Sequence, residues 1–265
     1  MPWGTEIEME IAGKTRIDDR LTCSQCAEKK DLGFDFTMAF QPIINFRRRN
    51  IFGYEALARG LNNESAYSVI SRVNQENLYL FDQLCRIKAI SLAAKLELDS
   101  ILSINFMPNA VYKPQRCIRT TLEAAKKYNF PINKIMFEFT EGEKLQDPEH
   151  VKRIIEYYHE EGFITAIDDF GAGHSGLGLL ANFQTTIVKL DMGLIRGIDT
   201  DKVRQSIVRN CVNMFRDLHI EPLAEGVETL EEANWLGTAG IELMQGYFFA
   251  RPGFECLPTV DFSYR

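Results

Sequence analysis

The sequence predicts an α/β protein, a (βα)8 TIM-like barrel whose first strand is antiparallel to the others. First, eight short apolar runs typical of β-strands alternate along the chain with amphipathic stretches typical of helices, and this order closes most simply into a barrel. Second, only residues 46–50 join the first two runs. A parallel crossover needs about a dozen residues, so these two strands are expected to form an antiparallel hairpin.

The expected strands are short and rich in apolar or β-branched residues. They cover residues 37–45, 51–58, 101–106, 134–139, 163–168, 186–190, 221–225 and 241–245. Helical spacing of apolar residues predicts helices at 77–98, 115–129, 148–161, 202–219 and 229–239. Pro114 and Pro148 suit helix starts, and Thr229 with Glu232 has the spacing of a capping box. We therefore expect the barrel to occupy residues 34–265.

Residues 1–33 are rich in charge and lack sustained periodicity, so we expect a lead-in or linker segment there. Cys23 and Cys26 form a C-x-x-C pair in this segment, without a second pair or a nearby histidine. Because a structural zinc site needs four ligands, a segment without a chemical role is favoured over metal or redox chemistry.

Composition limits the function classes. The chain has 265 residues, of which 45% are hydrophobic and 25% charged, as in a globular protein with a sizeable core. The formal net charge of −7 argues against broad binding to DNA or RNA. No apolar stretch approaches the roughly 18 residues of a membrane span, and no signal-peptide pattern opens the chain. We therefore expect no membrane insertion and a cytoplasmic location.

Acidic and amide residues recur where the predicted strands end. They are Glu55, Asn105, Glu138, Asp168, Asp169 and Glu225, with Lys189 at a further strand end. One such residue is usually a rim residue or a turn former, but the carboxyl ends of barrel strands converge on one mouth. A buried group of acids there would be costly without cations. Oxygen ligands without paired histidines or thiolates favour Mg²⁺ or Mn²⁺.

Alternation along a strand adds detail to the predicted site. Residues two apart share a face, so Glu55, Leu57 and Arg59 are expected to point the same way. A carboxylate and an arginine on one inward face can hold a metal ion and a phosphate bound to it. Lys189 and Asp191 share a face by the same rule.

Glu55-Ala56-Leu57 with Arg59 resembles the signature of the EAL domains, phosphodiesterases of the bacterial second messenger cyclic di-GMP. The resemblance runs from about Phe40 to Pro252. The other motifs follow in order: Phe40-Gln41-Pro42-Ile43, Ile104-Asn105 with Pro108, Glu138-Phe139-Thr140-Glu141, Asp168-Asp169-Phe170-Gly171-Ala172-Gly173, Val188-Lys189-Leu190-Asp191, Ala224-Glu225-Gly226-Val227-Glu228 and Gln245-Gly246-Tyr247.

The resemblance implies a homodimeric enzyme that opens cyclic di-GMP to linear pGpG with water activated by two cations. It implies one cation on Glu55, Asn105, Glu138 and Asp168, and a second on Asp168, Asp169 and Glu225. Lys189 would position the attacking water or help to deprotonate it, with Glu225 and Glu55 as the other catalytic residues. Substrate contacts would come from Gln41, Leu57, Arg59, Asp191 and Gln245. Glu141 and Glu228 would anchor the glycine-rich segment 171–178, a loop that the family links to dimerisation.

Two departures from the family pattern stand out. Ala58-Arg59-Gly60 stands where members commonly have a bulky residue and tryptophan, and segment 171–178 is richer in glycine, with His174 at a commonly aromatic place. A catalytically silent cyclic di-GMP receptor or protein-interaction scaffold is the main alternative. Such members lack a metal ligand, the lysine or the loop glutamate, all of which are present here. An unrelated metal-dependent hydrolase on the same barrel is a third possibility.

Overall fold

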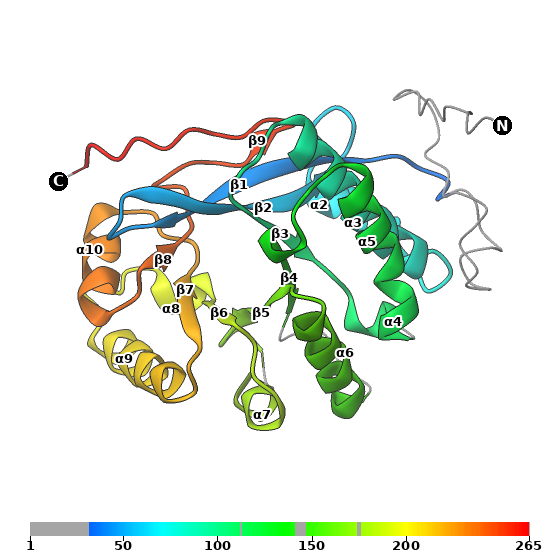
Figure 1. Ribbon diagram of the computed structural model, residues 1–265. Helices are drawn as coiled ribbons and strands as arrows, with labels where there is room; N and C mark the ends of the chain where they lie inside the picture. The colour runs from blue at the N-terminus through cyan, green and yellow to red at the C-terminus, as the bar shows by residue number, and fades with distance from the viewer. Residues whose placement is uncertain (1–31, 112, 141–146, 174–175, 265) are drawn as a thin grey trace, which may run out of the picture.

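The structure, a computed structural model, describes residues 32–111, 113–140, 147–173 and 176–264. The strands of this part form one sheet in the order β2-β3-β4-β5-β6-β7-β8-β1-β9, and β1 also pairs with β2, which closes the sheet into a ring. Figure 1 shows the helices around this ring. The predicted lead-in, with Cys23 and Cys26, lies outside the described residues up to position 31.

The strands confirm the expected barrel with a reversed first strand. Strand β1 pairs antiparallel with β2, and the pairs from β2 to β8 are all parallel. The last strand of the ring, β8, is shorter than the expected 241–245. The strands are β1 (Thr37–Asn45), β2 (Asn50–Arg59), β3 (Ile101–Asn105), β4 (Ile135–Thr140), β5 (Ile164–Phe170), β6 (Ile187–Leu190), β7 (Glu221–Ala224), β8 (Leu243–Met244) and β9 (Gly253–Phe254).

The five expected helices are present, and 115–129 forms two helices that meet at Ile118, which keeps right-handed helical dihedrals. Helices α2, α7 and α8 were not expected, because their four to seven residues are too few for a periodic signal. No helix of the described residues is long and apolar enough to cross a membrane. The helices are α2 (Ala66–Ile70), α3 (Leu78–Lys95), α4 (Pro114–Cys117), α5 (Arg119–Lys127), α6 (Pro148–Glu160), α7 (Gly176–Asn182), α8 (Met192–Ile195), α9 (Lys202–Asp217) and α10 (Leu230–Ala239), with 3-10 turns η1 (Pro108–Ala110) and η2 (Ile132–Lys134).

Side-chain caps fix where helices α6 and α10 begin. The Asp147 carboxylate accepts from the His150 amide at the start of α6. At α10 the predicted capping box is confirmed, because the Thr229 hydroxyl accepts from the Glu232 amide and the Glu232 carboxylate accepts from the Thr229 amide. Each cap satisfies amides that the helix leaves without a partner, and an N-cap contributes about 1 kcal/mol.

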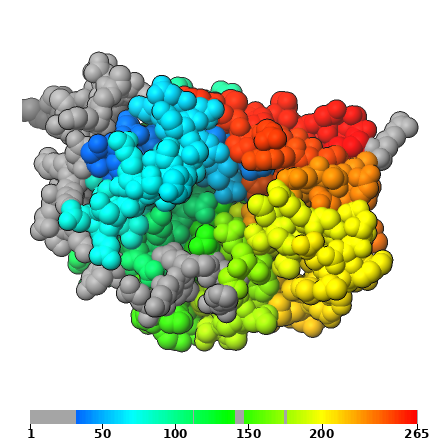
Figure 2. All heavy atoms as spheres, turned by 180° about the vertical axis from the view of Figure 1, so that it is seen from behind, coloured from blue at the N-terminus to red at the C-terminus, as the bar shows by residue number. Residues whose placement is uncertain are grey.

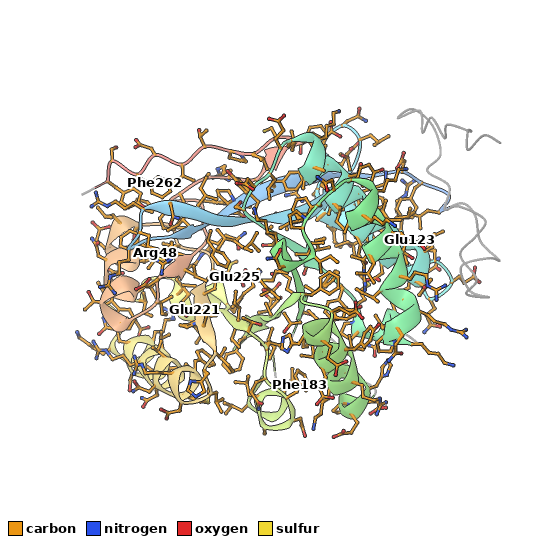
Figure 3. All side chains as sticks on the ribbon, viewed as in Figure 1. Arg48, Glu123, Phe183, Glu221, Glu225 and Phe262 are labelled. Carbon is orange, nitrogen blue, oxygen red and sulfur yellow. The ribbon has the colours of Figure 1, made fainter. Side chains whose placement is uncertain are left out.

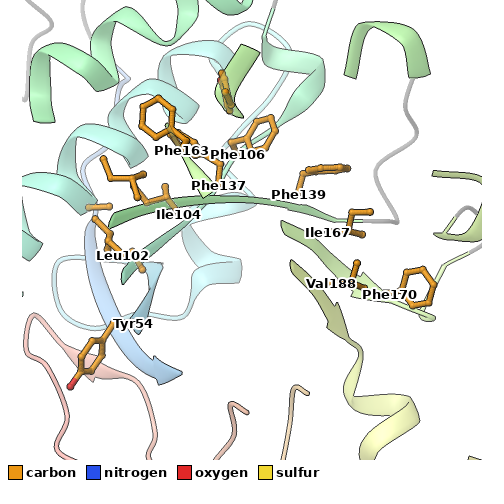
Figure 4. Packing of buried hydrophobic residues seen from close by; sticks show 14 of the residues in the cluster. Tyr54, Leu102, Ile104, Phe106, Phe137, Phe139, Phe163, Ile167, Phe170 and Val188 are labelled. Atoms are coloured by element: carbon orange, nitrogen blue, oxygen red, sulfur yellow. The ribbon is translucent and has the colours of Figure 1, made fainter. Parts of the chain in front are cut away.

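Alternate residues along the strands separate two apolar regions. Outward-facing residues such as Ile104, Phe137 and Phe139 pack against the helices (Figure 4). Inward-facing residues form a second cluster inside the ring, and none is more than 3% exposed. Full burial of an aliphatic side chain of this size stabilises by about 1.5–3 kcal/mol. The inner cluster is Ile43, Met136, Ala166, Ile187, Leu223 and Leu243.

The C-terminal segment after β9 runs along the β1–β2 hairpin (Figure 1). The Tyr54 hydroxyl donates to the Pro258 carbonyl at 2.9 Å, and the rings of Phe46 and Tyr264 stack with centroids 5.5 Å apart. In Figure 2, which shows the opposite side, the red C-terminal segment lies directly beside the cyan region. The two ends of the described chain are therefore joined by packing as well as by the sheet.

Candidate active site

A layer of polar side chains lies directly above the inner apolar cluster, at the carboxyl ends of the strands. Residues two apart on a strand share a face, so each polar residue of this layer points into the ring like the apolar residue before it. The pairs are Met136 and Glu138, Ala166 and Asp168, Ile187 and Lys189, Leu223 and Glu225, and Leu243 and Gln245. On the reversed strand β1 the order inverts, and Gln41 precedes Ile43. Figure 3 shows Glu221 and Glu225 at the two ends of β7.

Lys189 is fully buried at the centre of this layer. Its Nζ lies 2.9 Å from Glu225 Oε1, 3.0 Å from Asp168 Oδ1, 3.1 Å from Glu138 Oε2 and 3.5 Å from Glu55 Oε2. Burial alone would lower the pKa of Lys189, but the four carboxylates outweigh it and raise that pKa well above its ordinary value. Lys189 is therefore a permanently charged cation in contact with four carboxylates.

Amide side chains hold Glu55 from both sides. The Asn105 amide donates to Glu55 Oε1 at 3.1 Å and to Glu138 Oε1 at 3.2 Å. The Gln245 amide donates to Glu55 Oε2 at 2.9 Å. Gln41 lies opposite Glu55 in the register of the β1–β2 hairpin. The Asn105 and Gln245 amides therefore tie Glu55 to the ends of β3 and β8, whereas the Gln41 amide donates to the Ala250 carbonyl at 3.3 Å.

Two groups of carboxylates are compact enough to hold a metal ion each. Glu55, Glu138 and Asp168 form one group and Asp168, Asp169 and Glu225 the other, with ligand atoms within 4.8 Å of one another in each group. Asp168 belongs to both groups. Adjacent strand residues normally point to opposite faces, but Asp169 has a φ of 55°, which turns the chain at this point. Both aspartates can then face one site.

Crowded negative charge shifts the pKa values of the acids. Burial, and next the Glu55 carboxylate, raise the pKa of Glu138 well above its ordinary value. Burial also raises the pKa of Glu225 well above its ordinary value, although Lys189 opposes this shift. The pKa of Asp169 is raised to about 6 by burial and then by Asp168. Each shift has the sign that excess negative charge at low dielectric produces.

The charge balance of the site fits two divalent cations. When ionised, the five carboxylates of the two groups carry five negative charges, and Lys189 carries one positive charge, so four negative charges remain. Two divalent cations would supply four positive charges. The donors are carboxylate oxygens with one amide, the ligand type that Mg²⁺ and Mn²⁺ prefer. Asn105 would offer its Oδ1 after its amide group rotates by half a turn.

Three predicted substrate residues belong to neither acid group. Arg59 is half-buried, its Nη1 donates to the Ala58 carbonyl at 2.7 Å, and it makes no ion pair with any described residue. Leu57 is half-buried on β2. Asp191 caps α8, where its Oδ1 accepts from the Gly193 amide at 2.8 Å. The substrate roles of these three residues stay predictions.

The predicted anchors of segment 171–178 are Glu141 and Glu228, and the structure describes only Glu228. Glu228 forms an ion pair with Arg196, the C-cap residue of α8, and not with a described residue of 171–178. Its anchoring role therefore stays a prediction. Glu141 and His174 lie outside the described residues.

The motif search did not single out Ser103. This residue is fully buried and lies on the inward face of β3, two residues before Asn105. In the sheet it is the neighbour of both Glu55 and Met136. The two-residue period that placed the other members of the layer could have identified it.

A family model described as "EAL domain" matches residues 28–252. A crystal structure of a standalone versatile EAL protein from Vibrio cholerae O395, in its c-di-GMP bound form, is 70% identical. It aligns with a TM-score of 0.85 over 88% of this chain and 99% of that chain. A manganese/cyclic di-GMP complex of Klebsiella pneumoniae BlrP1 is 33% identical, with a TM-score of 0.79 over 84% of this chain and 57% of that one.

Two curated relatives come from Escherichia coli K12. The probable cyclic di-GMP phosphodiesterase PdeN is 29% identical over 242 residues, 86% of this chain and 44% of PdeN. The blue light- and temperature-regulated antirepressor BluF is 30% identical over 223 residues, 84% of this chain and 55% of BluF. The chain thus spans about half the length of these relatives. Because the family model covers most of its length, the chain belongs to the EAL domain family.

Proposed function

We propose that the chain hydrolyses cyclic di-GMP to linear pGpG in a reaction that requires two divalent cations, Mg²⁺ or Mn²⁺. The observation that carries this proposal is the pair of carboxylate groups that share Asp168 around the buried Lys189. The resemblance of the motifs, the relative named as a phosphodiesterase and the solved complexes with cyclic di-GMP support the substrate.

Two divalent cations, when bound, would supply positive charge to the phosphodiester and lower the pKa of a coordinated water. Glu55, Asn105, Glu138 and Asp168 would hold one, and Asp168, Asp169 and Glu225 the other. The Lys189 ammonium, in contact with Asp168 and Glu225, would donate a hydrogen bond to the attacking water and hold it in line with the phosphorus. Attack opposite the 3′-oxygen of one ribose then opens the ring, and no covalent enzyme intermediate is needed.

The substrate contacts would include a local rearrangement of Arg59. The Arg59 guanidinium would leave the Ala58 carbonyl and turn toward a phosphate oxygen, a bidentate partner that suits its planar fork. Gln41 and Gln245, both beside Glu55, would line the ribose and guanine contacts with Leu57 and Asp191. Binding of the substrate would then change the hydrogen bonding of the Glu55 carboxylate.

A cyclic di-GMP receptor or protein-binding scaffold is a second candidate, favoured by the similarity to a protein named as an antirepressor. The full set of acidic residues around Lys189 favours hydrolysis instead, because a receptor has no need for an array of buried acids that is costly without cations.

We also propose that residues 34–265 form the catalytic unit, preceded by a lead-in at 1–33, and that the protein is a cytoplasmic homodimer. The bacterial second messenger proposed as substrate supports the location. The family resemblance supports the dimer, and sedimentation equilibrium of the purified chain tests it.

The proposed function is tested by incubating the protein with cyclic di-GMP and Mg²⁺, Mn²⁺ or EDTA and separating the products by chromatography. We expect a pGpG peak with either cation, no peak with EDTA, and loss of the peak in Glu55→Ala but not in Glu64→Ala, a change at an exposed residue after the same strand. Tight binding of cyclic di-GMP without turnover would contradict hydrolysis and support the receptor function. Absence of both binding and turnover would contradict both functions and leave the scaffold as the remaining candidate.

A further inference from the structure

A buried ion pair lies outside the ring, on the buried face of helix α3. Asp82 and Arg86 are one helical turn apart, their charged atoms are 2.8 Å apart, and their side chains are at most 1% exposed. Burying two charges is costly, and apolar residues of similar size often stabilise a core as well or better. Stability alone therefore does not account for this pair.

The Asp82 carboxylate reaches the end of a site-bearing strand. Its Oδ1 accepts a hydrogen bond from the Met107 amide at 3.0 Å. Strand β3 ends at Asn105, and the Phe106 amide makes the last contact with β4, at the Glu138 carbonyl, 2.9 Å away. Asp82 thus fixes the chain two residues beyond Asn105, where the sheet no longer does so.

The Arg86 guanidinium reaches the same region from the helix side. Its Nη1 donates to the Tyr158 hydroxyl on α6 at 3.0 Å, and its centre lies 4.9 Å from the Phe137 ring and 5.6 Å from the Phe106 ring. The two rings lie together beside the strands (Figure 4), with centroids 5.8 Å apart. Phe106 follows Asn105 and Phe137 precedes Glu138, so Arg86 packs against a neighbour of each.

We propose that Asp82 and Arg86 are positioning residues that hold Asn105 and Glu138 in place for the cation these two share with Glu55. This inference rests on the proposed function. Asn105 is exposed at the mouth and bears a short amide, so a small shift of the β3 end displaces its oxygen from the cation. Loss of a group that orients metal ligands typically weakens metal binding about 10- to 100-fold.

The test is the double variant Asp82→Leu/Arg86→Met, which keeps an apolar core but removes the acceptor for the Met107 amide. We expect calorimetric titration to show Mn²⁺ binding weakened at least about tenfold, while the Tm of the metal-free protein falls no further than in the control variant below. The matched control is Leu84→Ala, which removes a buried apolar side chain of the same helix and keeps the Asp82–Arg86 pair. It should lower Tm and leave the Mn²⁺ dissociation constant within about twofold.

Unchanged Mn²⁺ binding in a folded double variant would overturn the inference, and so would equal weakening in Leu84→Ala. If the double variant does not fold, Tyr158→Phe provides the test. It removes only the hydroxyl that accepts the hydrogen bond from Arg86. Weaker Mn²⁺ binding at nearly unchanged Tm supports the positioning role, and wild-type binding contradicts it. A wild type that binds Mn²⁺ without producing pGpG overturns the proposed hydrolysis alone, because the readout here is binding. A wild type that binds no Mn²⁺ overturns both.

Discussion

Gln41 and Glu55 lie opposite each other across the antiparallel hairpin of β1 and β2. Reversal of β1 lets Gln41 reach the same mouth that the parallel strands reach with their carboxyl ends. Strand β8, the other neighbour of β1, supplies Gln245, whose amide lies 2.9 Å from Glu55 Oε2. Glu55 therefore has Gln41 opposite it on the reversed strand, and the hydrogen bond from Gln245 limits how its carboxylate can turn.

Glu55→Gln is expected to lower kcat at least about a hundredfold, because it removes one ligand charge and replaces an acceptor of three donors by an amide. The measurement is steady-state pGpG formation at saturating Mn²⁺. Glu64→Gln is the matched control, since Glu64 is exposed and outside the acid groups. Wild-type kcat in Glu55→Gln would rule out a metal-ligand role for Glu55.

Lys189→Met is expected to lower kcat about a hundredfold, because a nucleophile misplaced by about an ångström can cost this much in rate. Binding of Mn²⁺ should persist or tighten, because the competing cation among the four carboxylates is gone. Calorimetry and turnover measured on one preparation separate the two effects. Lys134→Met, at a partly exposed ion pair, controls for loss of a lysine elsewhere. Loss of Mn²⁺ binding in Lys189→Met would contradict this account.

Asp169 predicts how the stability of the metal-free protein depends on pH. Its pKa is about 6 in the folded chain, above the ordinary value of 3.8, so its contribution is present in full below about pH 4. That contribution is lost as pH rises through about 6. Asp169→Asn, which tolerates the positive φ, should therefore be more stable than the wild type in EDTA at pH 8 and nearly equal at pH 4. Urea unfolding at the two pH values measures this, and a difference that is the same at both would refute it.

Gly246→Ala is expected to lower both stability and turnover. A Cβ at this position would overlap the backbone of Val227, which is hydrogen bonded to the Gln245 carbonyl at 3.1 Å. Relief of the overlap moves Gln245 away from Glu55, at a cost of about 1–3 kcal/mol in the free energy of unfolding. Gly178→Ala is the control. Gly178 lies within helix α7, and no described residue outside that helix places an atom within 4 Å of a Cβ added there. The substitution should be neutral or should stabilise the protein by up to about 1 kcal/mol. Equal effects in the two variants would contradict the role of Gly246.

The alternation of residues in the strands made much of the site predictable. Glu138, Asp168 and Lys189 each follow an inward apolar residue by two positions, and short apolar runs marked their strands clearly. The five-residue connection at 46–50 was enough to predict the reversed strand. The barrel and the polar residues at its mouth could therefore be predicted from local sequence patterns.

Other features depend on contacts between segments far apart in the sequence. Nothing near Asp82 or Arg86 shows that the pair is buried, because an acid and a base four residues apart on a helix usually face solvent. Arg59 shares a strand face with Glu55, yet its long side chain turns to the neighbouring Ala58 carbonyl. Asp191 follows Lys189 by two residues, but the chain begins helix α8 there and uses the carboxylate as a cap.

The central claim is that two cations, sharing Asp168, are needed for hydrolysis. The most direct test is to titrate Mn²⁺ into metal-free protein with cyclic di-GMP present and to follow both bound Mn²⁺ and pGpG. We predict little turnover up to one equivalent of Mn²⁺ and a steep rise as the second equivalent binds. In Asp168→Asn we expect the amount of bound Mn²⁺ and the formation of pGpG to fall together. Full turnover at one equivalent, or two bound Mn²⁺ ions without any pGpG, would contradict the claim.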